Sequence, residues 1–273
     1  MIAIKYKREF FGELLGTFIV VLFGCGAVAV SVLFNSHQGL FQIAIVWGIG
    51  VSLAIYATRH LSCAHLNPAV SLAMVASKRM NIRKLPVYLL AQFMGAFLAG
   101  LILYLLFNPS IVAIENARHI VRGTPESMEI AKMFGEYYQL PGSTASVSIL
   151  LAMLAEGFGT FLLVLMIFLL TEGCNLGRPD DSMTPIFIGL TVTSVICLVG
   201  PLTQAGLNPA RDFSPRLVAW IFGWKDAAFP DKTGGFFFVY ILAPLLGGQV
   251  SAQLFTRVLE PLMKKSNEQC DCG

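Results

Sequence analysis

Charged side chains are scarce in this sequence of 273 residues. Asp, Glu, Lys and Arg make up 13% of it, whereas an average soluble domain carries roughly a quarter. Hydrophobic residues make up 56%, which is more than one soluble core can bury while polar groups still cover the exterior. The composition therefore excludes a soluble enzyme, a nucleic-acid-binding protein and a disordered chain, and it indicates a protein embedded in a lipid bilayer.

The sequence also lacks the spaced ligands of a metal centre and the paired cysteines of a disulfide framework. Its six cysteines follow neither pattern: Cys25, Cys63, Cys174, Cys197, Cys270 and Cys272. The Cys270-Asp271-Cys272 tail hints at a metal site, although a reduced tail is the favoured interpretation. Because no nucleophile set and no nucleotide-binding loop appears either, we expect no enzymatic activity, no cofactor and no metal centre.

Six stretches of the chain are almost free of charge and long enough to cross a membrane. They contain only two charged residues, Glu13 and Glu156, and extend over Phe10–Phe34, Leu40–Ala57, Leu85–Phe107, Ser146–Thr171, Pro185–Leu207 and Gly234–Thr256. Each is at or near the ~20 residues that a helix needs to span a bilayer. We therefore predict an all-α membrane protein with six transmembrane helices, the first of which is retained because no cleavage pattern follows it.

Lys and Arg residues are divided unequally between the two sides of the predicted spans. Twelve lie on the side of the N-terminus and seven on the other side. Cytoplasmic loops carry an excess of Lys and Arg, so we expect both termini to be cytoplasmic. The plain first span suits a bacterial inner membrane, which the chain would cross as a multi-pass protein.

The two halves of the chain resemble each other. Three motifs recur in the same order: Glu13-Leu-Leu-Gly16-Thr17-Phe18 with Glu156-Gly-Phe-Gly159-Thr160-Phe161, Ala64-His-Leu66-Asn67-Pro68-Ala69 with Ala205-Gly-Leu207-Asn208-Pro209-Ala210, and Val87-Tyr88-Leu-Leu90-Ala91 with Val239-Tyr240-Ile-Leu242-Ala243. Each half holds three spans, an odd number, so the second half enters the membrane from the opposite side, as in an inverted repeat. We assign residues 1–125 to the first repeat and the start of an outer loop, 126–145 to the connecting outer loop, and 146–273 to the second repeat and a cytoplasmic tail. The whole segment Asn108–Ala145 is expected to be loop.

The Asn-Pro-Ala copies lie between the second and third spans of each half. Asn is a favoured N-cap and Pro a favoured first helical residue, so Asn67 and Asn208 each predict a helix start. The apolar stretches that follow, Pro68–Ser77 and Pro209–Val218, have half the length of a span. We predict two re-entrant half-helices whose N-termini meet near the midplane. Two ordinary helix starts in loops are the alternative, which the duplication disfavours.

Such an arrangement favours neutral solutes over ions. Two positive helix ends would converge where a cation crosses, and irregular backbone at this depth must be buried or line water. Its carbonyls would form a row of acceptors while the Asn67 and Asn208 amides donate; the expected carbonyls belong to Cys63, Ala64, His65, Leu66, Gln204, Gly206 and Leu207. An ion regains far less of its hydration energy there than a neutral molecule does.

These motifs resemble the aquaporin/glycerol-facilitator superfamily, the major intrinsic proteins, along essentially the full chain. The second box, Asn208-Pro-Ala-Arg211-Asp212-Phe213-Ser-Pro215-Arg216, is similar to glycerol facilitators, as are His119-Ile-Val-Arg122-Gly123 followed by Glu126-Ser127, and Trp47-Gly-Ile-Gly50. Water-selective members usually have small residues in place of Asp212 and Arg216. The resemblance implies a passive channel for glycerol and other small neutral solutes together with water, and a homotetramer with a pore in each subunit.

The resemblance also implies a selectivity filter of four residues. They are Trp47, Ile196, Ala205 and Arg211. This set resembles that of plant nodulin-type proteins and their bacterial relatives more than that of glycerol facilitators. The Tyr240-Ile241 pair in the sixth span also resembles the nodulin-type proteins more. Urea and neutral metalloid hydroxides such as arsenite are therefore further candidate solutes. The alternatives for single residues are an interfacial anchor for Trp47 and a phosphate-facing side chain for Arg211.

The two intramembrane acids, Glu13 and Glu156, occupy equivalent places in the repeats. An acid inside a span is a candidate proton relay. The resemblance instead implies that both support the re-entrant loops by accepting backbone N–H bonds, and we assign the same supporting role to Asp212.

The sequence is compatible with three functions. The first is a passive channel for glycerol-like solutes. The second is a secondary transporter of a small polar solute coupled to ions or protons, because such proteins also use inverted repeats and broken helices. The third is a channel strictly for water. No span carries paired charges or an acidic cluster beyond the two Glu residues, which favours the channel.

Overall fold

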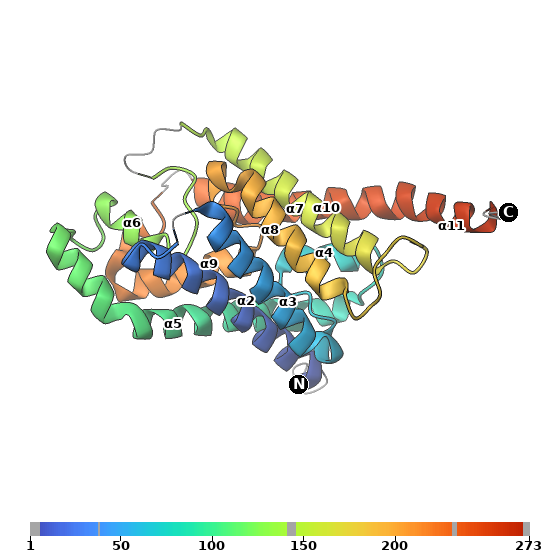
Figure 1. Cartoon of the computed structure of the whole chain (residues 1–273), viewed down its shortest axis with the longest axis horizontal. Coiled ribbons are helices and arrows are strands. Elements are labelled where there is room, and N and C mark those ends of the chain that lie inside the picture. The colour runs from blue at the N-terminus through green and yellow to red at the C-terminus, as the bar shows by residue number, and fades with distance from the viewer. Residues whose placement is uncertain (1–5, 38, 141–145, 231–233, 270–273) are drawn as a thin grey trace.

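The computed structural model describes residues 6–37, 39–140, 146–230 and 234–269, and every regular element among them is helical. Six helices are long and apolar enough to cross a membrane. The first five are α2 (Lys7–Phe34), α3 (Leu40–Ser62), α5 (Leu85–Arg118, preceded by the short η1, Ile82–Lys84), α7 (Ile149–Thr171) and α8 (Thr184–Thr203). The sixth extends over Phe237–Lys264 and consists of η5 (Phe237–Leu242), α10 (Ala243–Leu254), η6 (Phe255–Leu259) and the start of α11 (Glu260–Gln269). The six predicted spans are confirmed, and Figure 1 shows them side by side along the long axis.

Two short helices lie inside this bundle, as the repeated Asn-Pro-Ala boxes predict. They are α4 (Pro68–Ala76) and α9 (Pro209–Ala219), each with proline in its first turn. The Asn67 side chain accepts a hydrogen bond from the backbone N–H of Ala69 at 2.8 Å, and Asn208 accepts from Ala210 at 3.1 Å. Each asparagine thus satisfies helix-start N–H groups that would otherwise have no partner in the membrane.

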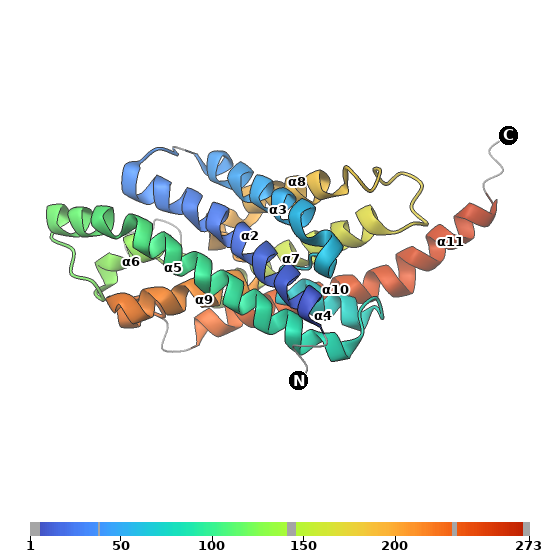
Figure 2. The ribbon, with the colours of Figure 1, turned by 90° about the horizontal axis from the view of Figure 1, so that it is seen from below.

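The contacts between helices follow the internal repeat. In the first half α2 packs against α3 and α5, and in the second half α7 packs against α8 and α10. Each half-helix packs against the third span of the opposite half, α4 against α10 and α9 against α5. The two halves therefore exchange their half-helices across the pseudo-two-fold axis, while α3 and α8 meet each other (Figure 2).

Helix backbones approach closely where glycines meet. A Cβ atom added at Gly247 of α10 would lie closer than 3.0 Å to the carbonyl of Gly157 in α7, and one at Gly95 of α5 would meet Leu14 of α2 in the same way. Small residues allow such approaches in membrane bundles, where dispersion contacts replace the hydrophobic effect between helices. The equivalent crossings in both halves bring the half-helices to the middle of the bundle.

The segment between the two halves contains more helix than predicted. The prediction of loop from Asn108 is wrong because α5 continues through Pro109 to Arg118. Proline removes one backbone hydrogen bond, and the full burial of Ile111 in a cluster with Phe134 and Trp224 offsets that loss. Beyond it lie the short helices η2 (Pro125–Ser127) and α6 (Met128–Ala131), whereas residues 141–145 and the Cys270 and Cys272 tail lie outside the described residues.

Candidate functional site: a cavity between the half-helices

A cavity of about 510 Å³ runs between the two half-helices. Its lining includes Arg59 and Asp181, where the end of α3 lies beside the start of α2, and also Trp47, which lies earlier on α3, and Arg211 of α9. Most of the pore residues predicted from the sequence line it: Trp47, Cys63, Ala64, His65, Leu66, Asn67, Ile196, Ala205, Gly206, Leu207, Asn208 and Arg211. The inverted repeat thus brings both Asn-Pro-Ala boxes to one space.

Gln204 is the exception among the predicted carbonyl residues. It does not line this cavity, and its side-chain oxygen accepts a hydrogen bond from the backbone N–H of Tyr137 at 2.9 Å. Gln204 ends α8 in the left-handed conformation, as Cys63 ends α3, so the two residues differ in what their side chains contact and not in backbone conformation. The place of Gln204 is therefore beside the segment that follows α6.

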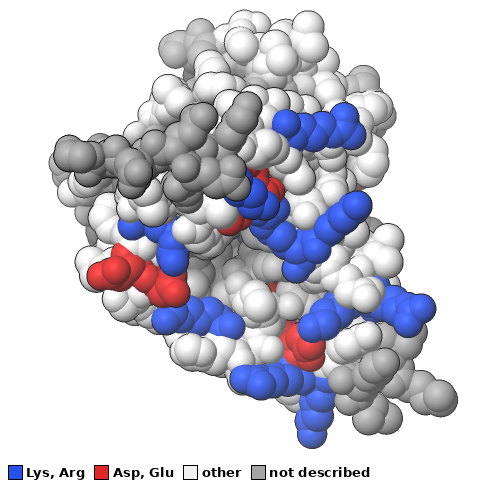
Figure 3. Space-filling view, turned by 90° about the vertical axis from the view of Figure 1, so that its right-hand side faces the viewer, with Lys and Arg blue, Asp and Glu red and all other residues white. Residues whose placement is uncertain are grey.

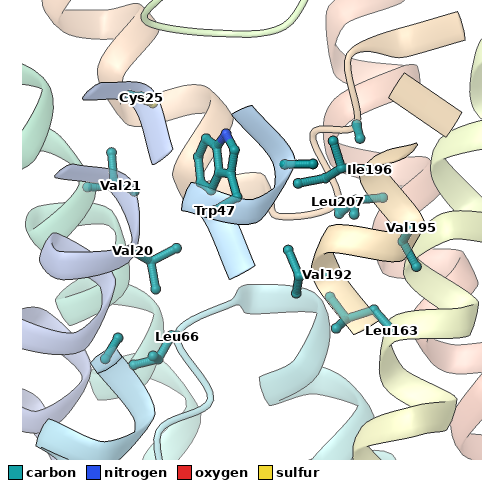
Figure 4. Close-up of a cluster of buried hydrophobic side chains, with 14 of the residues drawn as sticks. Val20, Val21, Cys25, Trp47, Leu66, Leu163, Val192, Val195, Ile196 and Leu207 are labelled. Atoms are coloured by element: carbon teal, nitrogen blue, oxygen red, sulfur yellow. The ribbon is translucent and has the colours of Figure 1, made fainter. Parts of the chain in front are cut away.

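One wall of the cavity is apolar. Val20 of α2, Leu163 of α7, and Val192 and Ile196 of α8 belong to a single hydrophobic cluster and also line the cavity. Figure 4 shows these side chains arranged around an open space, with Trp47 at one end. The facing wall is the irregular backbone before each half-helix. A molecule in the cavity therefore meets hydrocarbon on one side and hydrogen-bonding groups on the other.

The two asparagines hold the half-helices together by a reciprocal pair of hydrogen bonds. Asn67 Nδ2 donates to the carbonyl of Leu207 at 2.9 Å, and Asn208 Nδ2 donates to the carbonyl of Leu66 at 2.8 Å. An amide nitrogen carries two N–H groups and a carbonyl oxygen has two lone pairs. One donor on each asparagine and one acceptor site on each leucine carbonyl therefore stay available to a molecule in the cavity.

The backbone before each half-helix adopts an uncommon conformation, and it does so symmetrically. Three non-glycine residues in each copy have positive φ: Cys63 (67°), Ala64 (52°), Leu66 (55°), Gln204 (66°), Ala205 (65°) and Leu207 (54°). A left-handed residue costs roughly 1–2 kcal/mol. Such strain persists only where the surroundings hold it, so these loops need support.

Glu13 and Glu156 give that support in equivalent ways. Glu13 accepts hydrogen bonds from the backbone N–H groups of His65 at 2.9 Å and Leu66 at 2.7 Å. Glu156 accepts from those of Gly206 at 2.8 Å and Leu207 at 2.7 Å. Both carboxylates are completely buried. Their oxygens are thus directed at the loops rather than into the cavity.

Two tyrosines outside the predicted site residues complete this support. The Tyr88 hydroxyl donates to the carbonyl of Ser62, and the Tyr240 hydroxyl donates to the carbonyl of Thr203 at 2.9 Å. They stand at equivalent places because Val87-Tyr88 matches Val239-Tyr240 in the repeat. The repeat itself was therefore the signal that could have identified them.

The four residues of the predicted filter all line this cavity. Trp47, Ile196, Ala205 and Arg211 are each 5% exposed or less, so Trp47 is not an interfacial anchor and Arg211 does not face a lipid phosphate. The Arg211 guanidinium carbon lies 4.3 Å from the centre of the Trp47 ring. Arg211 Nη1 is buried without a hydrogen-bond partner in the structure, and the nearest carboxylate oxygen, Asp212 Oδ1, lies 3.6 Å from it.

A glutamate outside the predicted site residues holds the other side of Arg211. Glu136, in the segment after α6, forms an ion pair with Arg211 Nη2, and both side chains are 4% exposed. Asp212 holds Glu136 in place, since its Oδ1 accepts from the Glu136 backbone N–H at 2.7 Å. Asp212 also accepts from Arg216 Nε at 2.7 Å. Asp212 therefore supports the segment beside the filter rather than a loop before a half-helix.

The Trp47 ring rests on a glycine, and this contact predicts a mutational effect. A Cβ atom at Gly24 of α2 would lie closer than 3.0 Å to three ring atoms of Trp47. The change Gly24→Ala should push the ring towards the cavity and lower glycerol flux about tenfold, which corresponds to ~1.4 kcal/mol in the barrier. Stopped-flow light scattering on proteoliposomes measures this.

The control for that change is Gly26→Ala on the same helix. Its added Cβ would meet Leu103 Cδ2 at an ordinary 3.5 Å, so the flux should stay unchanged. Equal fluxes in the two variants would contradict the assigned role of the Gly24 contact.

The end of the cavity away from the filter is polar and basic. Arg59 Nη1 donates to the Asp181 carbonyl at 2.5 Å, and Arg79 pairs with Glu172 at 2.5 Å and with Glu260 at 3.2 Å. Figure 3 shows Lys and Arg side chains around a hollow on this face. Among the described residues, no group of three or more His, Cys, Asp or Glu side chains is placed to hold a metal ion.

Comparison with known proteins places these features in one family. Residues 1–255 match the family model described as Major intrinsic protein. The chain is 41% identical over 244 residues to the glycerol uptake facilitator protein of Pseudomonas aeruginosa, covering 88% of this chain and 84% of that protein. It is 38% identical over 253 residues to the propanediol uptake facilitator PduF of Citrobacter freundii, covering 91% of each.

A solved structure has the same fold. The aquaglyceroporin from Plasmodium falciparum superposes with a TM-score of 0.81 at 28% sequence identity, covering 95% of this chain and 99% of that one. The likeness of fold therefore extends over nearly the whole chain.

Proposed function

The chain belongs to the major intrinsic protein family of membrane channels, and we propose that it lets glycerol and related small neutral polyols diffuse passively across the membrane, with water. The observation that carries this proposal is the two-sided cavity, which has an apolar wall facing a row of donors and acceptors and ends at Trp47 and Arg211. Two of the relatives are named for the uptake of glycerol and propanediol, which supports the same class of solute.

The chemistry of the two walls suits a polyol. Each hydroxyl that leaves bulk water loses hydrogen bonds, and an unsatisfied polar group is costly in a dry environment. The Arg211 guanidinium, the second N–H group of Asn67 and of Asn208, and the loop carbonyls replace those bonds along the cavity. The C–H edge of the same molecule meets Val192 and Ile196 at no such cost.

The same cavity opposes the passage of cations. A cation must give up hydration that the sparse carbonyls do not replace. It also meets the positive N-terminal ends of α4 and α9 and the Arg211 guanidinium. Both effects act on charge and leave a neutral solute unaffected.

The filter composition supports polyols over a strict water channel. Ile196 offers no hydrogen-bond donor, and Ala205 has the smallest side chain that a non-glycine residue can present. Both leave room and an apolar edge for carbon atoms. The same two residues keep urea and neutral metalloid hydroxides among the solutes to be measured.

The described cavity wall supports a passive channel over a coupled transporter. Asp181, at the basic end, is the single carboxylate among the described residues that line it. The buried Glu13 and Glu156 carboxylates are engaged by backbone N–H groups of the loops. A proton relay requires a chain of titratable groups through the membrane, and these two acids stand apart from the cavity.

We also propose the orientation and assembly of the channel. The end that carries Arg8, Arg59, Arg79 and Lys84 would face the cytoplasm, in agreement with the positive-inside rule, and both termini would lie there in a bacterial inner membrane. The family resemblance implies a homotetramer with a pore in each subunit. Mass measurement of the detergent-solubilised protein tests the assembly.

A panel of solutes tests the proposed function. Proteoliposomes are exposed to inward gradients of glycerol, propanediol, urea, arsenous acid and a five-carbon polyol, and swelling is followed by light scattering. We expect rapid swelling with glycerol and propanediol and little with the five-carbon polyol. Rapid water flow without swelling in any solute would instead identify a strict water channel.

A further inference from the structure

The arginine of the filter has a buried anionic partner outside the cavity. Glu136 pairs with Arg211 Nη2, yet Glu136 is absent from the cavity wall. The pair joins α9 to the segment after α6, two parts of the chain separated by 75 positions. The conformation and charge of the filter arginine therefore depend on a residue outside this cavity, which instead lines a second cavity together with Arg216 and Tyr240.

The charges around this pair balance. Asp212 lies 3.6 Å from Arg211 Nη1 and 2.7 Å from Arg216 Nε, so two buried arginines face two buried carboxylates. The other titratable groups that act on Glu136 are uncharged near neutral pH, namely Cys25 of α2, Tyr137 of its own segment and Tyr240 of η5. The cluster carries no net charge while Glu136 is ionised, and one positive charge when Glu136 is protonated.

The contact with Glu136 occupies one of the two terminal nitrogens of the Arg211 guanidinium. Nη2 is taken by Glu136, while Nη1 has no hydrogen-bond partner and Arg211 lines the cavity. An ionised Glu136 therefore presents the solute with one guanidinium edge whose charge is compensated. A protonated Glu136 would leave the full charge of Arg211 to act on the solute in a low-dielectric site, where charge-assisted hydrogen bonds are the stronger ones.

We propose that Glu136 is a specificity-determining residue of the filter, because its carboxylate sets how strongly Arg211 holds a passing hydroxyl group. Flux requires binding that is favourable enough to admit a solute and weak enough to release it. With Glu136 ionised, Arg211 binds the hydroxyl weakly and glycerol passes quickly. With Glu136 neutral, the hydroxyl dwells at Arg211 and glycerol flux falls. The inference rests on the proposed glycerol channel and adds a residue to its filter.

Protonation of Glu136 is accessible near neutral pH. Burial raises the pKa of Glu136 to about 7, an effect that the nearby Arg211 guanidinium opposes and the Asp212 carboxylate reinforces. A raised pKa means that the carboxyl group is neutral below this value and ionised above it. Glycerol flux should therefore fall as the pH drops through this range.

The test compares pH profiles of glycerol flux in proteoliposomes between about pH 5.5 and about pH 8.5, a range in which an unperturbed Glu stays ionised. The wild-type protein should conduct about tenfold less glycerol at the acid end, ~1.4 kcal/mol in the barrier. The variant Glu136→Gln keeps the shape of the side chain without its charge. It should conduct at the low level throughout, with no pH dependence.

Two further variants control the experiment. Glu136→Asp keeps the charge and should retain a pH-dependent flux. Glu115→Gln removes a carboxylate that pairs with Arg122 at 2.7 Å and does not line the cavity, and should leave the wild-type profile unchanged. If Glu136→Gln does not fold, the profiles of the wild type and of Glu136→Asp decide alone.

The outcomes separate this inference from the proposed function. A wild-type flux that is high and flat with pH overturns the role of Glu136 and leaves the glycerol channel standing. A Glu136→Gln variant with the wild-type profile overturns it as well. The absence of glycerol flux at every pH would instead contradict the channel itself.

Discussion

Tryptophan in place of Ala205 is expected to reduce glycerol flux about a hundredfold, ~2.7 kcal/mol in the barrier, and water flux far less. Ala205 lines the same cavity as Ile196, Trp47 and Arg211. A second indole there would occupy the space that carbon atoms of a polyol need, whereas a water molecule requires little width. The measurement is the ratio of glycerol to water permeability of the same proteoliposomes.

The control for this change is Ala205→Gly. Ala205 has a φ of 65°, a conformation that glycine adopts without strain, so the loop should keep its shape and the flux of glycerol should persist. If Ala205→Trp instead lowered glycerol and water flux equally, Ala205 would not belong to the filter.

The second large effect concerns the acids under the loops. Replacing Glu156 by leucine leaves the backbone N–H groups of Gly206 and Leu207 buried without an acceptor. Each unsatisfied group costs about 1–3 kcal/mol, and the loop already carries the strain of three left-handed residues. We expect the loop to lose its conformation, with a lowered unfolding temperature in detergent and little remaining glycerol flux.

Glu156→Gln provides a graded comparison, because its amide oxygen can accept from one of the two N–H groups. Glu129→Gln is the matched surface control, since Glu129 is 52% exposed and only pairs with Arg118 at 3.6 Å, an interaction worth about 0–1 kcal/mol. A Glu156→Leu protein as stable as this control would refute the supporting role.

Much of the fold was predictable because local sequence determines it. Each span is a run of apolar residues of membrane length, and the N-cap and first-turn signals of Asn67-Pro68 and Asn208-Pro209 mark the half-helices directly. The duplication then places both half-helices in one inverted repeat. The continuation of α5 through Pro109 was not predictable in this way, because it depends on the burial of Ile111 by residues far along the chain.

Some residues of the candidate site were likewise predictable from the sequence, and others were not. Trp47 and Arg211 were predicted by resemblance, and the structure brings them together in the cavity wall. Glu136 was missed because its partner is 75 positions away and nothing in its own neighbourhood distinguishes it from a solvated acid in a loop. Gly24 was missed because only the position of the Trp47 ring makes it important. Both residues contact a filter residue from another part of the chain, and only the tertiary structure reveals such a contact.

The most direct test of the channel is the concentration dependence of glycerol entering proteoliposomes, with and without an imposed proton gradient. A passive channel predicts initial rates that rise in proportion to glycerol concentration, an internal concentration that stops at the external one, and no effect of the gradient. Saturation at low glycerol concentration, or accumulation driven by the gradient, would contradict the account and identify a coupled transporter.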